Sequence, residues 1–183
     1  MKFSETSLQG AFIVQPEPFK DDRGFFARVF CKKEFSEIGH DHEFVQINHS
    51  MNKVKGTVRG LHYQVPPYAE TKLVRCISGK VFDVIVDLRE GSSTYLKHFS
   101  VELSDENMTM IYIPSGFAHG FQTLTDNAQL IYHHTAFYAP GFEGGINFQD
   151  PALQINWPFP AVNLSERDKN HKFLTIDFKG IKL

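Results

Sequence analysis

The chain contains 183 residues, of which 42% are hydrophobic and 22% charged, and its formal net charge at pH 7 is -2. This length fits one domain with a core large enough to fold without disulfides. The small negative charge provides no basic field for nucleic acid, no apolar run approaches the roughly 20 residues of a membrane span, and the N-terminus lacks the pattern of a signal peptide. We therefore expect one domain over residues 1–183 in the cytoplasm, with no nucleic-acid or membrane partner.

Cysteine and phenylalanine are the two residue types whose numbers say most about the fold. Two cysteines, Cys31 and Cys76, are too few for a disulfide framework or a cysteine-rich zinc site. Cys76 lies in an apolar, strand-like run and is expected to be a buried free thiol. The 18 phenylalanines favour β-structure, because large flat side chains fit the half-buried face of a pleated sheet.

Short strand patterns separated by turn residues follow one another along most of the chain. The expected strands are, in chain order, Gly24–Phe30, Val45–His49, Val58–Gln64, Lys72–Ser78, Lys80–Leu88, Lys97–Leu103, Met108–Ile113, Phe117–Thr123 and Gln129–Tyr138. Lys32–Ile38 carries the one helical pattern, and Gly39 follows it where a left-handed residue often ends a helix. Strand spacings of roughly 8–12 residues predict a sandwich or a closed barrel, not a doubly wound sheet. From Pro140 onward the pattern loosens into a turn-rich wrap.

Alternation of side chains assigns faces within two of these strands. In Lys80–Leu88 it separates Phe82, Val84, Val86 and Leu88 from Val81, Asp83, Ile85 and Asp87. In Val58–Gln64 it places His62 and Gln64 on one face, and Arg59, Leu61 and Tyr63 on the other.

Two segments carry a histidine in a strand context: the strand with His62, and the turn and strand with His119. Either histidine alone is more typical of a satisfied core residue. Together the segments resemble the two signature regions of the cupin superfamily, since Pro114-x-Gly116-x-x-His119 matches the second. The first normally carries His-x-His and an acid that bind a metal, but here Gln64 and Lys72 replace two of the ligands. A protonated lysine has no lone pair to donate, so we expect no metal.

Eight motifs in order extend the resemblance from about residue 10 to about residue 170. They are DDRGFF (Asp21–Phe26), QINHS (Gln46–Ser50), RGLHYQ (Arg59–Gln64), KLVRC (Lys72–Cys76), GKVFDVIVDLR (Gly79–Arg89), IPSGFAHGF (Ile113–Phe121), FYAPGFEGGI (Phe137–Ile146) and LSERD (Leu164–Asp168). They resemble the dTDP-4-dehydrorhamnose 3,5-epimerases. The resemblance implies an all-β, cupin-type jelly-roll barrel with short peripheral helices. It also implies a cytoplasmic homodimer with exchanged N-terminal strands, acting in dTDP-rhamnose and deoxysugar biosynthesis.

The same resemblance implies roles for individual residues. His62 would be the catalytic base with Asp168 as its carboxylate partner, Lys72 would stabilise an enolate, and Tyr132 would be the acid on the opposite face. The residues implied to bind the substrate, a nucleotide-diphosphate 4-keto-6-deoxy sugar, are Arg23, Phe26, Gln46, Asn48, Arg59, His119, Tyr138 and Glu143. Arg23 and its neighbours would enter the partner's site.

The chemistry accounts for these residue types. The C4 ketone acidifies the hydrogens on C3 and C5, and removing either one gives an enolate whose charge collects on the C4 oxygen. A histidine with a reference pKa of about 6.5 is largely neutral at pH 7 and can act as a base. A carboxylate on its other nitrogen fixes the tautomer, a lysine stabilises the developing charge, and a protonated tyrosine can donate. No metal or other cofactor is required.

Each residue also has a purely structural interpretation. Ser165 and Asp168 have the spacing of a helix cap, Tyr132 could pack within a strand, Lys72 and Arg59 could be solvated, and Arg23 could be an ordinary turn residue. The shared order of the motifs favours the functional interpretation for all of them together.

Five positions depart from the family pattern and bear on specificity. Arg28 and Ile47 stand where the family has acidic residues, His133 and His134 stand in its Lys-Thr-Thr motif, and Phe148 replaces a tryptophan. By alternation His134 shares the face of Tyr132 and His133 points away. Arg28 would alter recognition near the nucleotide if it faces the site.

The proton-transfer residues are intact, so the sequence predicts an epimerase that inverts C3 and C5. A single-centre epimerase on a related nucleotide deoxysugar is the alternative within this class. Outside it, a metal-dependent cupin oxygenase is disfavoured by Gln64 and Lys72. A non-catalytic carbohydrate-binding cupin would not need His62, Lys72, Tyr132 and Asp168 together. The sequence leaves the nucleotide, the sugar and the pathway open.

Overall fold

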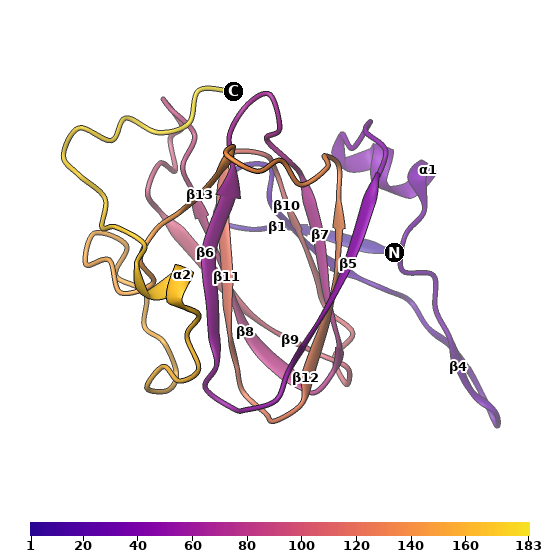
Figure 1. Ribbon diagram of the computed structural model, residues 1–183. Coiled ribbons are helices and arrows are strands. Elements are labelled where there is room, and N and C mark those ends of the chain that lie inside the picture. The colour runs from indigo at the N-terminus through magenta and orange to yellow at the C-terminus, as the bar shows by residue number, and fades with distance from the viewer.

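The computed structural model describes residues 1–183 and shows an all-β molecule with two short α-helices (Figure 1). The strands are β1 (Lys2–Glu5), β2 (Phe12–Gln15), β3 (Phe19–Asp21), β4 (Gly24–Phe26), β5 (Gln46–Asn52), β6 (Val58–Gln64), β7 (Lys72–Ser78), β8 (Lys80–Asp87), β9 (His98–Ser104), β10 (Met110–Ile113), β11 (Phe117–Thr123), β12 (Ala128–His134) and β13 (Glu143–Gly145). The helices are α1 (Lys32–Phe35) and α2 (Glu166–Lys169), and a 3-10 turn, Ser36–Ile38, follows α1. No helix is long and apolar enough to cross a membrane.

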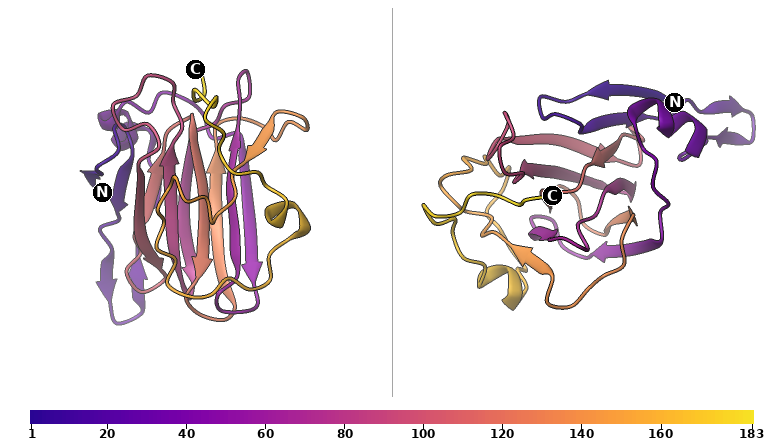
Figure 2. Two further views of the ribbon diagram at one scale, coloured as in Figure 1. Left: turned by 90° about the vertical axis from the view of Figure 1, so that its left-hand side faces the viewer. Right: turned by 90° about the horizontal axis from the view of Figure 1, so that it is seen from above.

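Two antiparallel sheets face each other and form the predicted cupin-type barrel. One has the strand order β1-β2-β10-β7-β12-β5 and the other β13-β6-β11-β8-β9. Seen from above, their strands surround a common interior, and β1 and β2 lie at its outer side (Figure 2). Strands β3 and β4 form a separate hairpin that projects away from the barrel (Figure 1).

Each predicted strand has a counterpart in the structure, and β6, β7 and β11 have the predicted bounds. The strand predicted over Gly24–Phe30 ends at Phe26, because Val29 and Phe30 turn to pack in the cluster around Phe35. The strand predicted to reach Tyr138 ends at His134. Strands β1, β2, β3 and β13 were not predicted; each has only three or four residues, too few to show alternation.

The predicted helix over Lys32–Ile38 is confirmed as α1 and the 3-10 turn that continues it. Gly39 ends this segment in the left-handed region, with φ of 80°. The buried ring of Phe35 attaches it to the barrel. The helix therefore belongs to the outer layer and contributes no residue to the cavities between the two sheets.

Three apolar clusters hold these layers together. The first fills the barrel and joins Val74 and Leu130 of one sheet to Ile85 of the other. The second lies on the outer face of the five-stranded sheet, where the C-terminal wrap covers residues such as Val84 with Leu153. The third packs the N-terminal segment and α1 against the outer face of the six-stranded sheet.

The alternation predicted for β8 is confirmed, because Val81 and Ile85 belong to the cluster inside the barrel whereas Val84, Val86 and Leu88 belong to the outer one. The second set packs against the C-terminal wrap. Strand β8 thus turns its two aspartates, Asp83 and Asp87, toward the interior face.

The faces predicted for β6 are wrong at Arg59, which lines the interior pocket on the same side as His62. The pairing with β11 shifts by one residue: His62 lies opposite His119, but Arg59 lies opposite Phe121. This β-bulge falls at Gly60, whose φ is 111°. A Cβ there would lie 2.7 Å from the Gly120 Cα, so the bulge requires glycine. The bulge adds an arginine to the wall that carries His62.

Candidate active site

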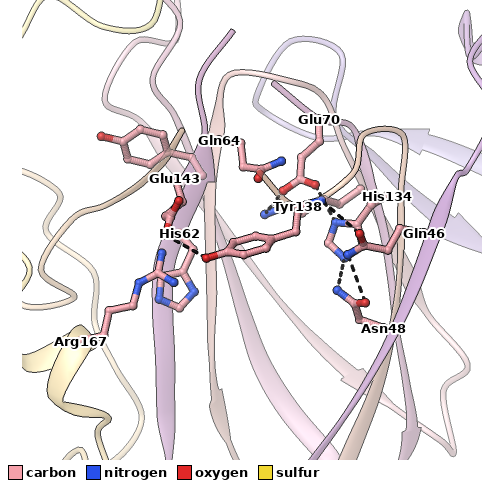
Figure 3. Close-up of a pocket in the computed structure, with 11 residues that line it drawn as sticks. Gln46, Asn48, His62, Gln64, Glu70, His134, Tyr138, Glu143 and Arg167 are labelled. Carbon is pink, nitrogen blue, oxygen red and sulfur yellow. Dashed lines mark hydrogen bonds and ion pairs between the residues drawn. The ribbon is translucent and has the colours of Figure 1, made fainter. Parts of the chain in front are cut away.

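A polar pocket lies between the two sheets and consists of two adjoining cavities of about 430 and 270 Å³. Both cavities are lined by Asn48, His62, Lys72 and His134, so they form one continuous site. Figure 3 shows the lining of the larger of the two. Nine residues of the predicted site line it: Gln46, Asn48, Arg59, His62, Lys72, His119, Tyr132, Tyr138 and Glu143. The sequence therefore located the pocket wall, although these residues come from strands far apart along the chain.

Asp168 stands directly behind His62. The His62 Nε2 atom lies 2.6 Å from Asp168 Oδ1, and the carboxylate is buried. Because Nε2 is engaged, Nδ1 is the nitrogen available to a ligand. Burial alone would raise the pKa of Asp168, but the hydrogen bond and charge of His62 hold that pKa below its usual value. The ionised carboxylate accepts the Nε2 proton, so when the imidazole is neutral the lone pair is on Nδ1.

Asp168 also takes part in the helix cap predicted as its structural interpretation. The Ser165 hydroxyl accepts a hydrogen bond from the Asp168 backbone N–H at 3.0 Å, at the start of α2. The two interpretations are compatible, because the cap uses the backbone of Asp168 and the contact with His62 uses its carboxylate. The cap thereby fixes the position of the group that orients His62.

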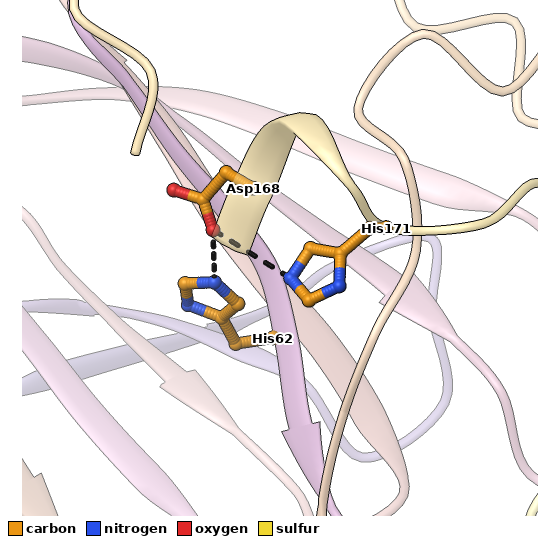
Figure 4. A group of neighbouring side chains, drawn as sticks. All are labelled: His62, Asp168 and His171. Atoms are coloured by element: carbon orange, nitrogen blue, oxygen red, sulfur yellow. Dashed lines mark hydrogen bonds and ion pairs between the residues drawn. The ribbon is translucent and has the colours of Figure 1, made fainter. Parts of the chain in front are cut away.

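His171 is a neighbour of this pair that sequence reasoning missed. Its Nε2 atom lies 3.6 Å from the same Asp168 oxygen, and its ring centroid is 5.4 Å from that of His62 (Figure 4). Burial, followed by the nearby charge of His62, lowers the pKa of His171. The only signal in the sequence was its spacing of three residues after Asp168.

His62, Asp168 and His171 are also the residues with the ligand types and proximity of a metal site. Ligands of a zinc ion each lie about 2 Å from it and so stand further apart from one another than a hydrogen bond allows. The 2.6 Å contact between His62 and Asp168 therefore fits a shared proton.

Lys72 lies in the opposite part of the lining and is buried. Its Nζ atom is 3.1 Å from Glu70 Oε1, and Glu70 Oε2 accepts a hydrogen bond from His134 Nδ1 at 2.8 Å. His134 Nε2 in turn accepts from Asn48 Nδ2 at 3.3 Å. His134 lines the pocket as alternation predicted. Glu70 was missed because it precedes the strand pattern that begins at Lys72.

Tyr132 and His119 occupy the inner end of the pocket. The Tyr132 hydroxyl shares a hydrogen bond of 3.1 Å with Ser50, and burial raises the tyrosine's pKa. His119 donates from Nε2 to Asp83 Oδ2 at 2.8 Å, and its ring centroid is 6.0 Å from that of Tyr132. Tyr132 therefore enters any reaction protonated, with an imidazole held beside it.

The remaining lining residues place hydrogen-bonding groups in the wall and at the rim of the pocket. Arg59 donates from Nε to Asn52 Oδ1 at 2.6 Å, which leaves its terminal N–H groups available. Tyr138 donates from its hydroxyl to Glu143 Oε1 at 2.9 Å, at the outer rim. Arg167, next to Asp168 on α2, also lines the rim and was not singled out from the sequence (Figure 3).

Arg23 and Phe26 are the two predicted site residues that this chain does not bring to its own pocket. They lie on the β3–β4 hairpin, where the Arg23 side chain is 90% exposed and pairs with Asp21. Phe19 and Phe26 are also strongly exposed there. Within one chain this hairpin faces solvent.

The positions that depart from the family pattern divide into one inside the pocket and four outside it. Arg28 pairs with Glu34 at 2.9 Å, and Ile47 is 62% exposed. His133 packs against Phe44, and Phe148 against Trp157. Only His134 changes the chemistry of the pocket wall.

Comparison with known proteins agrees with this geometry. The family model for dTDP-4-dehydrorhamnose 3,5-epimerase matches residues 5–175. A relative of that name from Shigella flexneri is 46% identical, with 97% of this chain and 99% of the relative covered.

Two solved structures extend the comparison. The crystal structure of a dTDP-6-deoxy-D-glucose-3,5-epimerase from Legionella pneumophila Philadelphia 1, in complex with dTDP-4-keto-L-rhamnose, has a TM-score of 0.93 and 40% identity over 99% of this chain and 97% of that one. A 3'-monoepimerase from Streptomyces bikiniensis, in complex with dTDP-quinovose, has a TM-score of 0.84 and 34% identity over 92% and 85%. The chain therefore belongs to the dTDP-4-dehydrorhamnose 3,5-epimerase family and is an isomerase.

Proposed function

We propose that this chain inverts C3 and C5 of a dTDP-linked 4-keto-6-deoxy sugar, by proton removal to an enolate and proton return from the opposite face. The observation that carries the proposal is one pocket that holds a histidine–carboxylate pair, a buried lysine and a protonated tyrosine. The reaction takes place in the cytoplasm and uses no cofactor, since these side chains supply every proton transfer.

His62 is the base in this proposal. Its Nε2 proton is held by Asp168, so Nδ1 carries the lone pair that removes the C3 or C5 proton. The same carboxylate stabilises the imidazolium that forms. Asp168 therefore acts both on the orientation of the ring and on the charge it acquires.

Lys72 stabilises the enolate. An ammonium group has three N–H donors, and Glu70 occupies one of them. The other two are available to the C4 oxygen, where negative charge collects when a neighbouring carbon loses its proton. In a buried site such a donor is worth more than it is in water.

Tyr132 returns the proton from the other face. It lies on β12, in the sheet opposite β6, so a sugar between the sheets would have His62 on one side and Tyr132 on the other. Its raised pKa keeps the hydroxyl protonated until the enolate accepts the proton.

Six residues would bind the rest of the substrate: Gln46, Asn48, Arg59, His119, Tyr138 and Glu143. Arg59 is the cation placed to meet the diphosphate. In our proposal Arg23 and Phe26 complete the site of a second copy, because the hairpin that carries them projects away from its own pocket (Figure 1). Sedimentation should then give twice the mass of one chain, and a fully active monomer would contradict this part.

The proposal is tested by incubating the protein with dTDP-4-keto-6-deoxyglucose, freshly made by its dehydratase, in deuterated water. Because each inversion passes through an enolate, deuterium should enter at C3 and C5 and the product should have the inverted configuration at both. A sugar recovered without deuterium at either carbon would contradict the function.

The second candidate function is inversion at one centre. The likeness to the Streptomyces bikiniensis 3'-monoepimerase favours it, because that enzyme shares the fold at a TM-score of 0.84. The same incubation separates the two functions, since a single epimerase introduces deuterium at one carbon of the product.

A further inference from the structure

Glu70, Lys72 and His134 form a contiguous cluster in the pocket wall. Figure 3 shows Glu70 and His134 on the side of the pocket away from His62. All three side chains are largely buried: 9% of Glu70, 9% of Lys72 and 10% of His134 is exposed. Buried charges are uncommon unless each meets a partner, so the contacts within the cluster need a reason.

The sheet itself brings the three residues together. Lys72 and His134 are directly opposite each other in the β7–β12 ladder. Glu70 precedes Lys72 by two residues, the spacing of neighbours on one face of an extended segment. The Thr135 N–H donates to the Thr71 carbonyl at 3.1 Å and so continues the ladder beyond Lys72. The ladder therefore fixes the backbone next to Glu70, in addition to the contacts of its side chain.

Glu70 bridges the other two members. Its Oε1 atom lies 3.1 Å from Lys72 Nζ, and its Oε2 atom accepts the His134 Nδ1 proton at 2.8 Å. Burial alone would raise the pKa of Glu70, but the hydrogen bond from His134 and the charge of Lys72 lower it. The carboxylate is thus ionised and held from both ends.

His134 is in turn fixed by its second nitrogen. Its Nε2 atom accepts from Asn48 at 3.3 Å, which sets the tautomer that donates from Nδ1 to Glu70. The family pattern has threonine at this position, whose shorter side chain has no second ring nitrogen. A threonine there could not link Asn48 to Glu70 as the two ring nitrogens of His134 do.

We propose that Glu70, held by His134, is a positioning residue that keeps the Lys72 ammonium directed at the substrate. This rests on the proposed role of Lys72 in stabilising the enolate. A lysine side chain is a flexible stem of four carbons that ends in a compact charge. An ammonium without a fixed acceptor therefore samples several positions. Anchoring one of its three donors leaves two aimed at the pocket.

Replacing Glu70 by alanine removes the anchor and should lower kcat by roughly 10- to 100-fold, as expected for a small displacement of a catalytic group. KM should change by less than about threefold, because the anchor does not touch the substrate. Glu70→Gln retains a carbonyl oxygen that can accept from Lys72 and should restore most of the rate. Glu43→Ala is the matched control, since Glu43 pairs with Lys32 at the surface.

A double-mutant cycle distinguishes positioning from a structural role. In a Lys72→Met background, Glu70→Ala should cause no further loss of deuterium uptake measured over long incubations, because its effect passes through Lys72. His134→Val provides a second route if Glu70→Ala folds poorly, and it should lose rate in the Lys72 protein but not in the Lys72→Met protein.

Two results would overturn the inference: an unchanged kcat in Glu70→Ala, or an equal fold loss in both backgrounds. Failure of the proposed function has a different signature, because the wild-type protein itself would then take up no deuterium.

Discussion

Two polar clusters, each with a buried aspartate of β8, differ in how completely their hydrogen bonds are satisfied. The first surrounds Asp87 on β8. Its carboxylate accepts from the backbone and side chain of Arg89, and from the hydroxyls of Ser92 and Thr94, at distances of 2.6 to 3.0 Å. Both oxygens are fully used, and no part of this cluster faces the pocket.

The second cluster lies in and directly behind the pocket wall, and its hydrogen bonds are incomplete. Asp83 lies on the same face of β8 as Asp87, but only its Oδ2 atom has a partner, His119. The Nε2 atom of His171 has no hydrogen bond either. Lys72 uses one of its three donors on Glu70.

The difference in hydrogen bonding distinguishes residues that stabilise the fold, such as Asp87, from residues that are free to contact a ligand, such as Lys72. Buried polar groups in proteins are nearly always paired, so a donor of the pocket wall that lacks a protein partner, as on Lys72, is available to a ligand or to water. Substitutions in the pocket should therefore affect the reaction more than stability, and substitutions at Asp87 should do the reverse.

The largest effect is expected at His62. His62→Ala should lose both deuterium uptake and inversion, by roughly 10²- to 10⁴-fold, because no enolate forms without the base. The midpoint of thermal unfolding should change little, since the ring is 35% exposed. Deuterium uptake at the wild-type rate would remove His62 from the proposed role.

Tyr132→Phe should give the next largest effect and a different one. The ring packing remains, but the transferable proton is gone. Protonated His62 can still return a solvent-derived proton to the face it came from, so deuterium should enter the sugar with little net inversion. Inversion at an undiminished rate would assign the acid to another group, with His134 as the nearest candidate on the same strand.

These two residues also show what the sequence could predict. His62 and Tyr132 lie in predicted strands and both line the pocket, and the family resemblance implied a role for each. Arg59 was placed on the wrong face, because a bulge at Gly60 interrupts the alternation and a bulge is fixed by the contact with Gly120 in another strand.

Glu70 and His171 could not be predicted for a related reason. Both lie just outside a regular element, and their importance comes from neighbours distant in sequence: Glu70 meets His134, and His171 meets His62. The short strands β1, β2 and β3 were missed because they form by pairing with neighbouring strands and are too short to show an alternating pattern of their own. Sequence reasoning thus found most of the strands and most residues of the pocket wall, but not Glu70 and His171, whose contacts depend on the fold.

Arg59→Ala tests the binding part of the pocket. Loss of one hydrogen-bonded charge pair to the diphosphate corresponds to about 1.5–3 kcal/mol, or roughly a 10- to 100-fold weaker binding of dTDP in calorimetry. Lys97→Ala, a surface change outside the pocket, is the control. Equal affinities for the two variants would exclude Arg59 from the ligand site.

Asp87→Asn tests the satisfied cluster. Burial would raise the pKa of Asp87, but the hydrogen bonds from Arg89, Ser92 and Thr94 lower it to about 2 from an ordinary value of 3.8. A depressed pKa stabilises the fold above about pH 4, by about 2 kcal/mol, and this contribution disappears as the pH falls toward 2.

Denaturant unfolding of Asp87→Asn should therefore show a loss of about 2 kcal/mol at pH 7 that shrinks below pH 4. Its kcat per folded molecule should match that of the wild type. A large loss of kcat with unchanged stability would reverse the distinction between the two clusters.

Removal of metal ions should have the smallest effect. Gln64 and Lys72 occupy two of the positions that bind metal in other cupins, and both make other contacts here. Gln64 donates to the carbonyls of Tyr68 and Phe137 and accepts from the Ala139 N–H, so its amide holds the loops at the rim. Lys72 is bound to Glu70 as an ammonium. His62 and His119 alone are too few ligands for a stable catalytic metal site.

Activity should survive prolonged treatment with a strong chelator, and elemental analysis should find no stoichiometric metal. A loss of activity that one added metal restores would show that the pocket needs a bound metal ion. The proposed roles of the side chains in proton transfer would then be wrong.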